Sequence, residues 1–503
     1  MQQLVLHPVD ITLVVVYLVA IAAMGLWLSR GVKSGKDLFL GGRSLPWWAV
    51  GTSLVVSDIG AKDMVGLADD GYRFGLVMTN FDLIGCVFPV LVAAFLFMPY
   101  FWLAGVYTIP EYLGRRYNSA VRTYFAVIWA LFMIGTLATI FVSAATMFEN
   151  LLGWNFWFSV IATAVVVGLY TTIGGLKAVV YTDFVSCIVL IVGTILICIV
   201  GLSEVGGWSG LQERIAAIEG TEHHFSILRP ASDANYPWPA VLLGLGFVLG
   251  PAYWIGNQAI VQRTFGTRSQ QEARASYVLC AAIKLVFPFL LVIPGMIGLA
   301  LFSEQLPQAG SEEWVGGQVL PMVVQLLPKG VLGIILGAFL AGVMSNLDSY
   351  VNSASTLVVT DIYKPFIHRD ASDHECLVVG RWLVVVFLTG GAGASYLVIT
   401  RFSSVYEAFQ TFLSFFQGSL LALLLAGMLS KRTTQWGGVA GMLTGVGAAA
   451  ALHVAGYLFL WVAWWSFVVA ISTTILVSLV TKPYDDDRLR GLVYSLSADE
   501  ETT

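Results

Sequence analysis

Seven charged side chains stand inside long apolar stretches of the sequence. They are Asp58, Lys62, Asp63, Asp82, Asp183, Lys284 and Asp348. Charges are costly within a bilayer and normally face a polar cavity, an ion or a partner of opposite charge. One of them alone fits a structural ion pair, but seven in so apolar a chain indicate a pathway for a solute or an ion.

A polar stripe in the segment 328–362 adds oxygen atoms to these charges. Its members recur every three or four residues and therefore share one helix face: Ser345, Asp348, Ser349, Asn352 and Thr356. Ser and Thr stripes also serve as packing between membrane helices. The carboxylate within this stripe favours cation coordination instead.

The elements that must position these side chains are membrane helices. Of the 503 residues, 57% are apolar and 11% are charged, against roughly 25% charged in an ordinary soluble protein. This excludes a soluble enzyme and predicts an all-α integral membrane protein. Apolar windows predict 13 spans, near residues 9–29, 46–66, 75–103, 119–150, 155–174, 180–203, 237–262, 272–302, 328–362, 378–399, 404–430, 436–456 and 458–481.

Two of these spans carry signals that break a helix. Span 46–66 holds polar residues where a membrane helix is normally most apolar, and span 237–262 holds Gly250-Pro251 and Gly256. Interrupted segments in matching positions of two halves point to a midplane binding site between inverted repeats. Freed carbonyl oxygens there can replace the hydration shell of a cation. The alternative is two kinked helices whose backbone groups are satisfied by neighbours.

The spans divide the chain into six parts. Residues 1–45 form an extra helix and a cytoplasmic loop, 46–203 the first repeat, 204–236 an extracellular loop, 237–430 the second repeat, 431–482 additional helices and 483–503 a cytoplasmic tail. One side carries 19 of the 26 Lys and Arg residues, Arg263 among them, and the other carries five. The positive-inside rule then predicts a multi-pass protein of the plasma or inner membrane, with its N-terminus outside and its C-terminus cytoplasmic.

Five segments in order resemble the sodium/solute symporter family, which includes sodium-coupled sugar transporters. They are FLGGRSLPWWAVGTSLVVSDIGA (39–61), GGLKAVVYTDF (174–184), YWIGNQAIVQRTF (253–265), AAIKLVFPFLLVIPG (281–295) and NSASTLVVTDIY (352–363). The resemblance implies a LeuT-like inverted five-helix repeat with discontinuous first and sixth core helices. It also implies alternating access driven by a sodium gradient.

The resemblance further implies sites for one or two sodium ions. The general site aligns to the carbonyls of Val56, Ile59 and Gly342, the hydroxyl of Ser345, and Asn346, where the family usually has a second serine. A second site, found in some members, aligns to Asp183, Ser345, Asp348 and Ser349. The family usually has a neutral hydroxyl residue in place of Asp348, so this carboxylate would hold a cation or carry a proton.

The solute contacts of the sugar-transporting branch align to Asp82, Tyr253, Lys284 and Gln410. Asp63 stands where that branch has a glutamine. A carboxylate and an ammonium can bracket a polyhydroxylated solute, and Lys284 lies so deep in its span that a partner such as Asp82 is expected. Lys62 either pairs with Asp58 four residues earlier or contacts the solute. Asp69 and Asp70, at the outer mouth, are expected to form a solvated rim.

The leading function is sodium-coupled import of a small organic solute, a sugar or polyol. Alternatives are a symporter of an amino acid, a quaternary amine or an acidic sugar, and a solute sensor of the same fold that does not transport. A channel fits broken helices around a midplane pocket least well. No HExxH, GxSxG or Walker motif supports an enzyme, and no basic tract suggests nucleic acid. The expected partners are the solute, sodium and the bilayer, and a monomer is the working expectation.

Overall fold

The computed structural model describes residues 7–30, 35–106, 108–171, 175–306, 316–328, 330–402 and 404–494. Within these ranges the regular structure is helical and contains no strand, as predicted. The long helices are α1 (Pro8–Ser29), α9 (Ser119–Leu152), α10 (Phe156–Thr171), α11 (Leu176–Val205), α16 (Gln270–Lys284), α17 (Phe287–Phe302), α19 (Val331–Leu357), α20 (Asp373–Arg401), α22 (Gln417–Leu429), α23 (Gln435–Val454) and α24 (Phe459–Val480).

Shorter helices complete several of these spans. They are α3 (Trp47–Asp58), α4 (Ala61–Phe74), η2 (Gly75–Thr79), α5 (Asn80–Asp82), η3 (Leu83–Val87), α6 (Phe88–Val92), η4 (Ala93–Phe97), α7 (Met98–Leu103), η5 (Val241–Leu249), α14 (Gly250–Gly256), α15 (Gln258–Phe265), η6 (Val358–Ile367) and α21 (Val405–Ser414). In the described ranges, ten helices are long and apolar enough to cross a membrane, or eleven if the bent pair α21–α22 forms one span. The count of 13 spans therefore stays a prediction. Helices that are interrupted, and the short apolar helix within α10, are too short to be counted as membrane-spanning by themselves.

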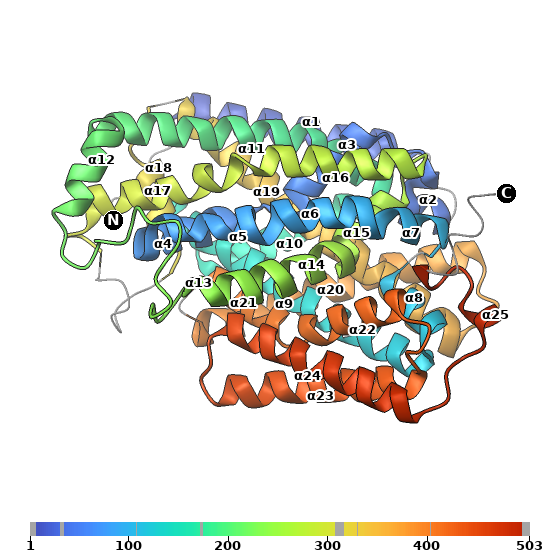
Figure 1. Ribbon diagram of the computed structural model, residues 1–503. Helices are drawn as coiled ribbons and strands as arrows, with labels where there is room; N and C mark the ends of the chain where they lie inside the picture. Colours follow the sequence, from blue (N-terminus) through green and yellow to red (C-terminus); the bar gives the residue numbers. More distant parts are fainter. Residues whose placement is uncertain are drawn as a thin grey trace.

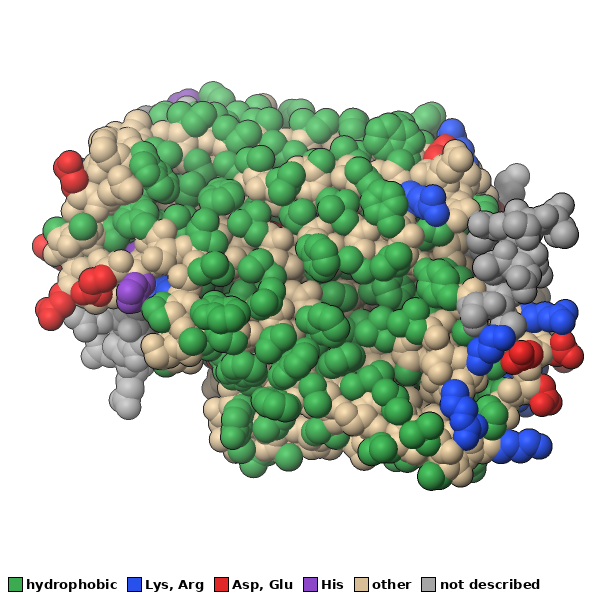
Figure 2. Space-filling view, viewed as in Figure 1, with side chains coloured by type: hydrophobic (Ala, Val, Ile, Leu, Met, Phe, Trp, Pro, Cys, Tyr) green, Lys and Arg blue, Asp and Glu red, His purple; other side chains and the backbone are tan. Residues whose placement is uncertain are grey.

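The helices run roughly parallel to one axis, and the connecting elements gather at its two ends (Figure 1). One end carries α12 (Gly207–Ala216), α13 (Trp238–Ala240) and α18 (Val319–Val324). The other carries α2 (Gly35–Leu40), α8 (Ile109–Arg116) and α25 (Asp486–Leu489). Figure 2 shows apolar side chains over the flank between the ends, with most Lys and Arg side chains of this face at the α25 end. An apolar flank between two polar ends is the surface that a bilayer requires.

Both predicted helix breaks are present. Between α3 and α4, Ile59 and Gly60 adopt extended backbone conformations. Between α14 and α15, Asn257 is extended at φ −73° and ψ 117°. The chain does not unwind at Gly250-Pro251, which correctly marks the span but not the break. There the π-helical η5 passes directly into α14 with helical backbone at Leu249 and Gly250, so a continuing helix accommodates Pro251.

α19 crosses the first break at very short range. A Cβ atom added at Gly342 of α19 would lie 3.1 Å from the Cα of Gly60, and one added at Gly60 would lie 2.4 Å from the side chain of Asn346. Glycine at both positions permits this close approach. The polar stripe of α19 is thereby held against the unwound backbone.

α1 is tied to the start of α19. The buried Asp10 carboxylate accepts hydrogen bonds from the backbone amides of Gly330 and Gly333, at 2.8 and 2.7 Å. These amides would otherwise lack partners at a helix N-terminus. Tyr17 of α1 also shares a hydrogen bond of 3.0 Å with Ser186 of α11.

The packing of α4 on α17 provides a stability test. A Cβ atom at Gly295 would lie 2.0 Å from the carbonyl oxygen of Ala68, so Gly295→Ala must separate the two helices. We expect a loss of about 1–3 kcal/mol in the free energy of unfolding, measured by thermal denaturation of the purified protein. Gly393→Ala is the matched control, because no atom lies within 4 Å of that Cβ position. Equal melting of both variants would contradict this packing.

Candidate functional site

The first part of the candidate site is the break between α3 and α4. The carbonyl oxygen of Val56 accepts a hydrogen bond from the side-chain amide of Asn346, at 2.5 Å, and a longer one from the Ser345 hydroxyl, at 3.4 Å. Ile59 and Gly342 lie at the same crossing, Ile59 in the extended segment and Gly342 against Gly60. The predicted members of the general sodium site thus lie at one helix crossing, and their binding of sodium stays a prediction.

Asn346 presents an oxygen that has no hydrogen-bond partner among the described residues. Its Oδ1 atom is buried and accepts no hydrogen bond from the described residues. A buried, unsatisfied oxygen is costly unless it meets a donor, a water or a cation. Beside freed main-chain carbonyls and a hydroxyl, it offers the hard oxygen ligands that small cations prefer.

Next to this crossing, Asp183 of α11 forms a hydrogen-bonded ion pair. Ser345 and Ser53 donate to its carboxylate at 2.6 and 2.5 Å. Arg263 lies with Nη2 3.5 Å from the same carboxylate, and both side chains are 1% exposed. Arg263 also donates to Ser53 at 2.7 Å and to Ser349. Arg263 is therefore not the cytoplasmic loop residue that the charge count assumed, because its charge is neutralised inside the protein.

The other members of the predicted second cation site have different partners. Asp348 accepts a hydrogen bond from Thr171 of α10. Ser349 lies 3.2 Å from the hydroxyl of Ser57 and donates to the carbonyl of Ser345 at 2.5 Å. The guanidinium of Arg263 supplies a positive charge to Asp183, so a cation at this point would have to share the carboxylate with it. A second site stays a prediction.

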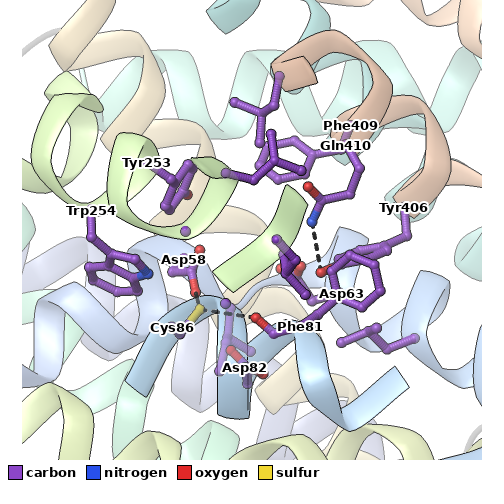
Figure 3. Close-up of a pocket in the computed structure, with 17 residues that line it drawn as sticks. Asp58, Asp63, Phe81, Asp82, Cys86, Tyr253, Trp254, Tyr406, Phe409 and Gln410 are labelled. Carbon is purple, nitrogen blue, oxygen red and sulfur yellow. Dashed lines mark hydrogen bonds between the residues drawn. The ribbon is translucent and has the colours of Figure 1, made fainter. Parts of the chain in front are cut away.

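The second part of the candidate site is a small, largely buried pocket beside both helix breaks (Figure 3). Four of the five predicted solute contacts line it: Asp63, Asp82, Tyr253 and Gln410. The fifth, Lys284, bonds to the pocket's carboxylates. The space open to the centre of a water molecule is only about 40 Å³, room for a few waters. The pocket is closed in this conformation and must widen to admit an organic solute.

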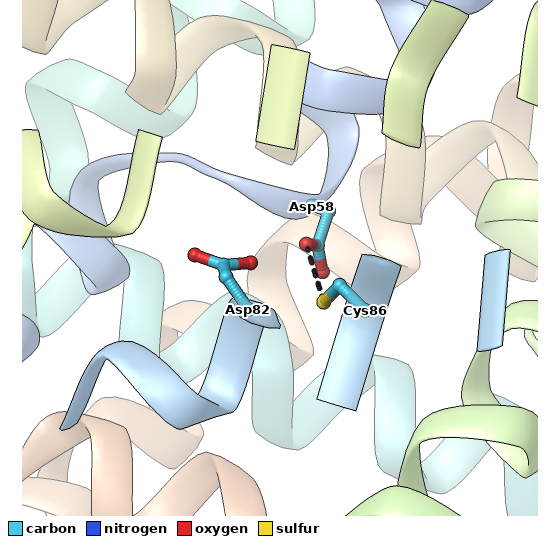
Figure 4. A group of neighbouring side chains, drawn as sticks. All are labelled: Asp58, Asp82 and Cys86. Atoms are coloured by element: carbon cyan, nitrogen blue, oxygen red, sulfur yellow. Dashed lines mark hydrogen bonds between the residues drawn. The ribbon is translucent and has the colours of Figure 1, made fainter. Parts of the chain in front are cut away.

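Lys284 joins two of the pocket's carboxylates. Its ammonium lies 2.6 Å from Asp82, the expected partner, and also pairs with Asp58. It lies 3.7 Å from the sulfur of Cys86. Asp58, Asp82 and Cys86 point toward one another with metal-like spacing (Figure 4). Because the lysine donates to all three, an ammonium already occupies the position where a metal ion would bind.

Lys62 pairs with Asp63, not with the carboxylate of Asp58. Its ammonium lies 2.7 Å from Asp63 and donates to the backbone carbonyl of Asp58 at 3.1 Å. Asp63 also accepts a hydrogen bond from the amide of Gly60, at 2.8 Å, and so caps α4 at the break. The predicted pairing of Lys62 with the Asp58 carboxylate is wrong, because that carboxylate pairs with Lys284 from another helix. Asp63 therefore lines the pocket and also binds the backbone at the break between α3 and α4.

Aromatic rings form much of the remaining pocket wall. They belong to Phe81, Tyr253, Trp254, Tyr406 and Phe409. Gln410 donates to the Tyr406 hydroxyl at 2.9 Å, and the Tyr253 and Tyr350 hydroxyls lie 2.9 Å apart. The sequence did not single out Cys86, Trp254, Tyr406 or Phe409. The signal for Tyr406 and Phe409 was weak but present, since Tyr406, Phe409 and Gln410 recur at helical spacing on α21.

The outer end of α4 is buried, contrary to the expectation of a solvated rim. Asp69 and Asp70 are each 2% exposed. Asp69 accepts a hydrogen bond from the amide of Val319 at 3.3 Å, and Asp70 lies 3.5 Å from Arg73. Nearby, the ring of His224 donates through Nε2 to the carbonyl of Tyr72 at 3.1 Å. Burial of its ring lowers the pKa of His224 below the ordinary value of 6.5.

Comparisons with known proteins relate the chain to sodium-coupled transporters. The model of the sodium:solute symporter family matches residues 38–445. A sodium/glucose cotransporter of Vibrio parahaemolyticus is 32% identical over 466 residues, spanning 87% of this chain and 84% of the relative. Sodium/glucose cotransporter 2 of Rattus norvegicus is 33% identical over 481 residues, spanning 88% of this chain and 71% of the relative.

Solved structures support the fold. A sodium-coupled sialic acid symporter in a substrate-bound, outward-open state superposes with a TM-score of 0.82 at 20% identity, covering 95% of this chain and 99% of that chain. A nucleobase-cation-symport-1 transporter in a closed conformation gives a TM-score of 0.54 at 11% identity, covering 90% and 97%. The arrangement of helices is thus the predicted LeuT-like one.

The shared ion pair of Lys284 can be tested by a double-mutant cycle. Lys284→Met leaves Asp58 and Asp82 buried without their cation, and we expect a loss of about 3–5 kcal/mol in stability. Adding Asp82→Asn should restore part of it, because one excess negative charge is removed. Thermal unfolding of the single and double variants measures the coupling. Lys177→Met, at an exposed position of α11, is the control, and a cycle without coupling would contradict the pairing.

His224 makes the segment 221–236, beside the outer end of α4, sensitive to acid. Because its folded-state pKa is lowered, its contribution to stability is full above about pH 6.5 and is lost as the pH falls toward the folded-state pKa. We expect hydrogen exchange in residues 221–236, corrected for the intrinsic rate, to become faster as the pH is lowered from about 7.5 to about 5. His224→Gln should flatten this dependence, whereas His223→Gln, at an exposed position, should keep it. The same pH profile in all three proteins would contradict the prediction.

Proposed function

The chain belongs to the sodium:solute symporter family, and on that premise we propose that it imports a small polyhydroxylated solute, a sugar or polyol, together with sodium by alternating access. It is a membrane transporter and not an enzyme, and sodium is the coupling ion. One observation supports the proposal above the others. The unwound segment at Ile59 and Gly60 borders the charged solute pocket on one side and the Asn346 and Ser345 oxygens on the other.

Sodium binding at this crossing would draw the unwound segment and α19 together. The proposed ligands are the carbonyls of Val56, Ile59 and Gly342 with the side-chain oxygens of Ser345 and Asn346. Asn346 favours this role because its Oδ1 atom is buried and has no partner among the described residues. For Oδ1 and the Val56 carbonyl to bind one ion, the asparagine amide must turn away from the hydrogen bond that it now donates.

Coupling to the solute would pass through Asp63. Its carboxylate lines the pocket and holds the amide of Gly60. A solute that binds Asp63 changes this cap and thereby the conformation of the preceding residue, Ile59. A ligand shifts such an equilibrium only by its differential affinity for the two conformations. Sodium and solute that both favour one arrangement of residues 58–63 would therefore bind cooperatively.

The sugar or polyol assignment is supported by the pocket and by the relatives. Asp82 and Lys284 offer one acceptor group and one donor group to hydroxyls, Gln410 offers both, and Tyr253 offers an aromatic face for an apolar sugar face. The curated relatives with about 30% identity are sodium/glucose cotransporters. The pocket carries more charge than a neutral sugar needs, which keeps an amino acid, a quaternary amine or an acidic sugar as the second candidate. A sensor of this fold that does not transport is the third.

We further propose that the protein lies in the plasma or inner membrane with the α25 end in the cytoplasm. Lys431 and Arg490 lie at that end, because they pair with Asp486 and Asp487 of α25, and Figure 2 shows Lys and Arg side chains gathered there. Basic side chains favour the cytoplasmic face. The two inverted repeats, over about 46–203 and 237–430, would then each begin with one of the broken helices.

The sodium site is tested by uptake into proteoliposomes. Replacing external sodium with potassium or choline should abolish accumulation of the transported solute. Ser345→Ala and Asn346→Ala should each raise the half-saturating sodium concentration at least about tenfold, because each removes one oxygen ligand worth about 1.4 kcal/mol. Ser355→Ala is the control on the same helix, since Ser355 donates only within α19, to Val351. Accumulation that ignores sodium, or unchanged sodium affinity in both variants, would contradict the proposal.

A further inference from the structure

The charges of the solute pocket do not balance. Its lining contains three carboxylates, those of Asp58, Asp63 and Asp82. Two ammonium groups face them, Lys62 on Asp63 and Lys284 shared by Asp58 and Asp82. Among the described residues that line the pocket, there is no further Lys, Arg or His. Two positive charges against three negative ones leave one excess negative charge in a small, largely buried pocket.

The proposed sodium ion lies nearer to a different carboxylate. Beside Ser345, the Asp183 carboxylate accepts from the Ser53 and Ser345 hydroxyls and pairs with the guanidinium of Arg263. Ser345 is both a proposed sodium ligand and a donor to Asp183, at 2.6 Å. A sodium ion at this hydroxyl therefore lies beside the Asp183 carboxylate. The excess in the solute pocket remains.

A buried charge without a counter-charge costs several kcal/mol. A proton, an ion or the solute itself can neutralise it. A metal ion is disfavoured, because the ammonium of Lys284 already lies among Asp58, Asp82 and Cys86. The choice is between a pocket that binds a neutral solute after taking up a proton and one whose solute brings the missing charge.

The aromatic walls favour a solute that brings the charge. The Lys62 ammonium lies 4.1 Å from the centre of the Phe409 ring, and the Lys284 ammonium lies 5.5 Å from that of Trp254. Aromatic faces attract ammonium groups, more strongly when water is excluded. The pocket adds Phe81, Tyr253 and Tyr406 to these rings. Carboxylates surrounded by aromatic rings suit an amine, whereas Gln410 is the sole carboxamide among the lining residues for a neutral solute.

We propose that the transported solute carries one positive charge on an amine beside its hydroxyl groups, as in an amino sugar or an aminopolyol. This inference rests on the proposed function and specifies its solute. The ammonium binds between Asp63 and Asp82, and the hydroxyls bind Lys284 and Gln410. The complex is then neutral in the pocket.

Sodium-driven uptake of matched compounds tests the inference. Proteoliposomes with the full chain are given an inward sodium gradient and the glucose, galactose and mannose skeletons, each as the neutral sugar, the 2-amino sugar and its N-acetyl derivative. We expect at least one amino sugar to be taken up with a KM at least about tenfold below that of its neutral partner, as one desolvated charge pair of about 1.4 kcal/mol predicts. The N-acetyl compound should behave like the neutral one, because acetylation removes the charge.

A variant separates charge recognition from shape. Asp82→Asn leaves Lys284 paired with Asp58 and brings the pocket to zero net charge, so the preference for the amine should fall about tenfold while neutral sugars bind as well or better. Asp69→Asn is the control, since Asp69 binds backbone amides at the outer end and does not line the pocket. If the variant does not fold, the ratio of the KM values for the neutral sugar and the amino sugar in the unmodified protein still tests whether the solute is an amine.

The outcomes distinguish the two proposals. Neutral sugars taken up as well as or better than their amino forms would overturn the inference and leave sodium-coupled sugar import standing. An amine preference that survives Asp82→Asn would overturn the charge basis of the inference. No sodium-driven uptake of any of the nine compounds would count against both.

Discussion

An unwound backbone within a membrane protein must find new partners for every amide and carbonyl that leaves the helix, because neither water nor lipid supplies them. At Ile59 and Gly60 the chain meets this constraint with side chains from its own neighbourhood. Asp63 caps the amide of Gly60, and Asn346 binds the carbonyl of Val56. Each partner belongs to one of the two candidate sites. The requirement to satisfy the backbone is thus what brings the ion crossing and the solute pocket to the same few residues.

The buried charges obey a similar constraint. Every buried Lys or Arg of the two clusters contacts a carboxylate from another part of the chain or from the next residue: Lys62 with Asp63, Lys284 with Asp82 and Arg263 with Asp183. Ion pairs of this kind add little net stability, because desolvation offsets their attraction. Their value lies in holding carboxylates in place inside a closed pocket. Binding can then proceed by replacing one partner with another, without bringing a bare charge into the interior.

Much of this arrangement could be predicted from sequence, and the failures have physical causes. The break at residues 58–60 was predictable because polar residues stand where a lone helix would face hydrocarbon. The break near Gly256 was predicted less well, since Gly250-Pro251 looked the stronger signal but a π-helical stretch accommodates it. Arg263 looked like a loop cation because charge counting carries no information about depth. Asp69 and Asp70 looked solvated for the same reason, although loop backbone and Arg73 cover them. Pairings between distant helices, such as Lys284 with Asp58, depend on tertiary packing that local spacing cannot reveal.

The attachment of α1 gives this fold a built-in frame of reference. Asp10 binds the first turn of α19, and Tyr17 binds α11. These hydrogen bonds hold α1 against both helices. Most of its surface nevertheless faces outward. A spin label or fluorophore attached there would ride with α19 and disturb little of the interior. Distances from such a marker to α4 or α14 would report any displacement of these helices relative to α1, α11 and α19.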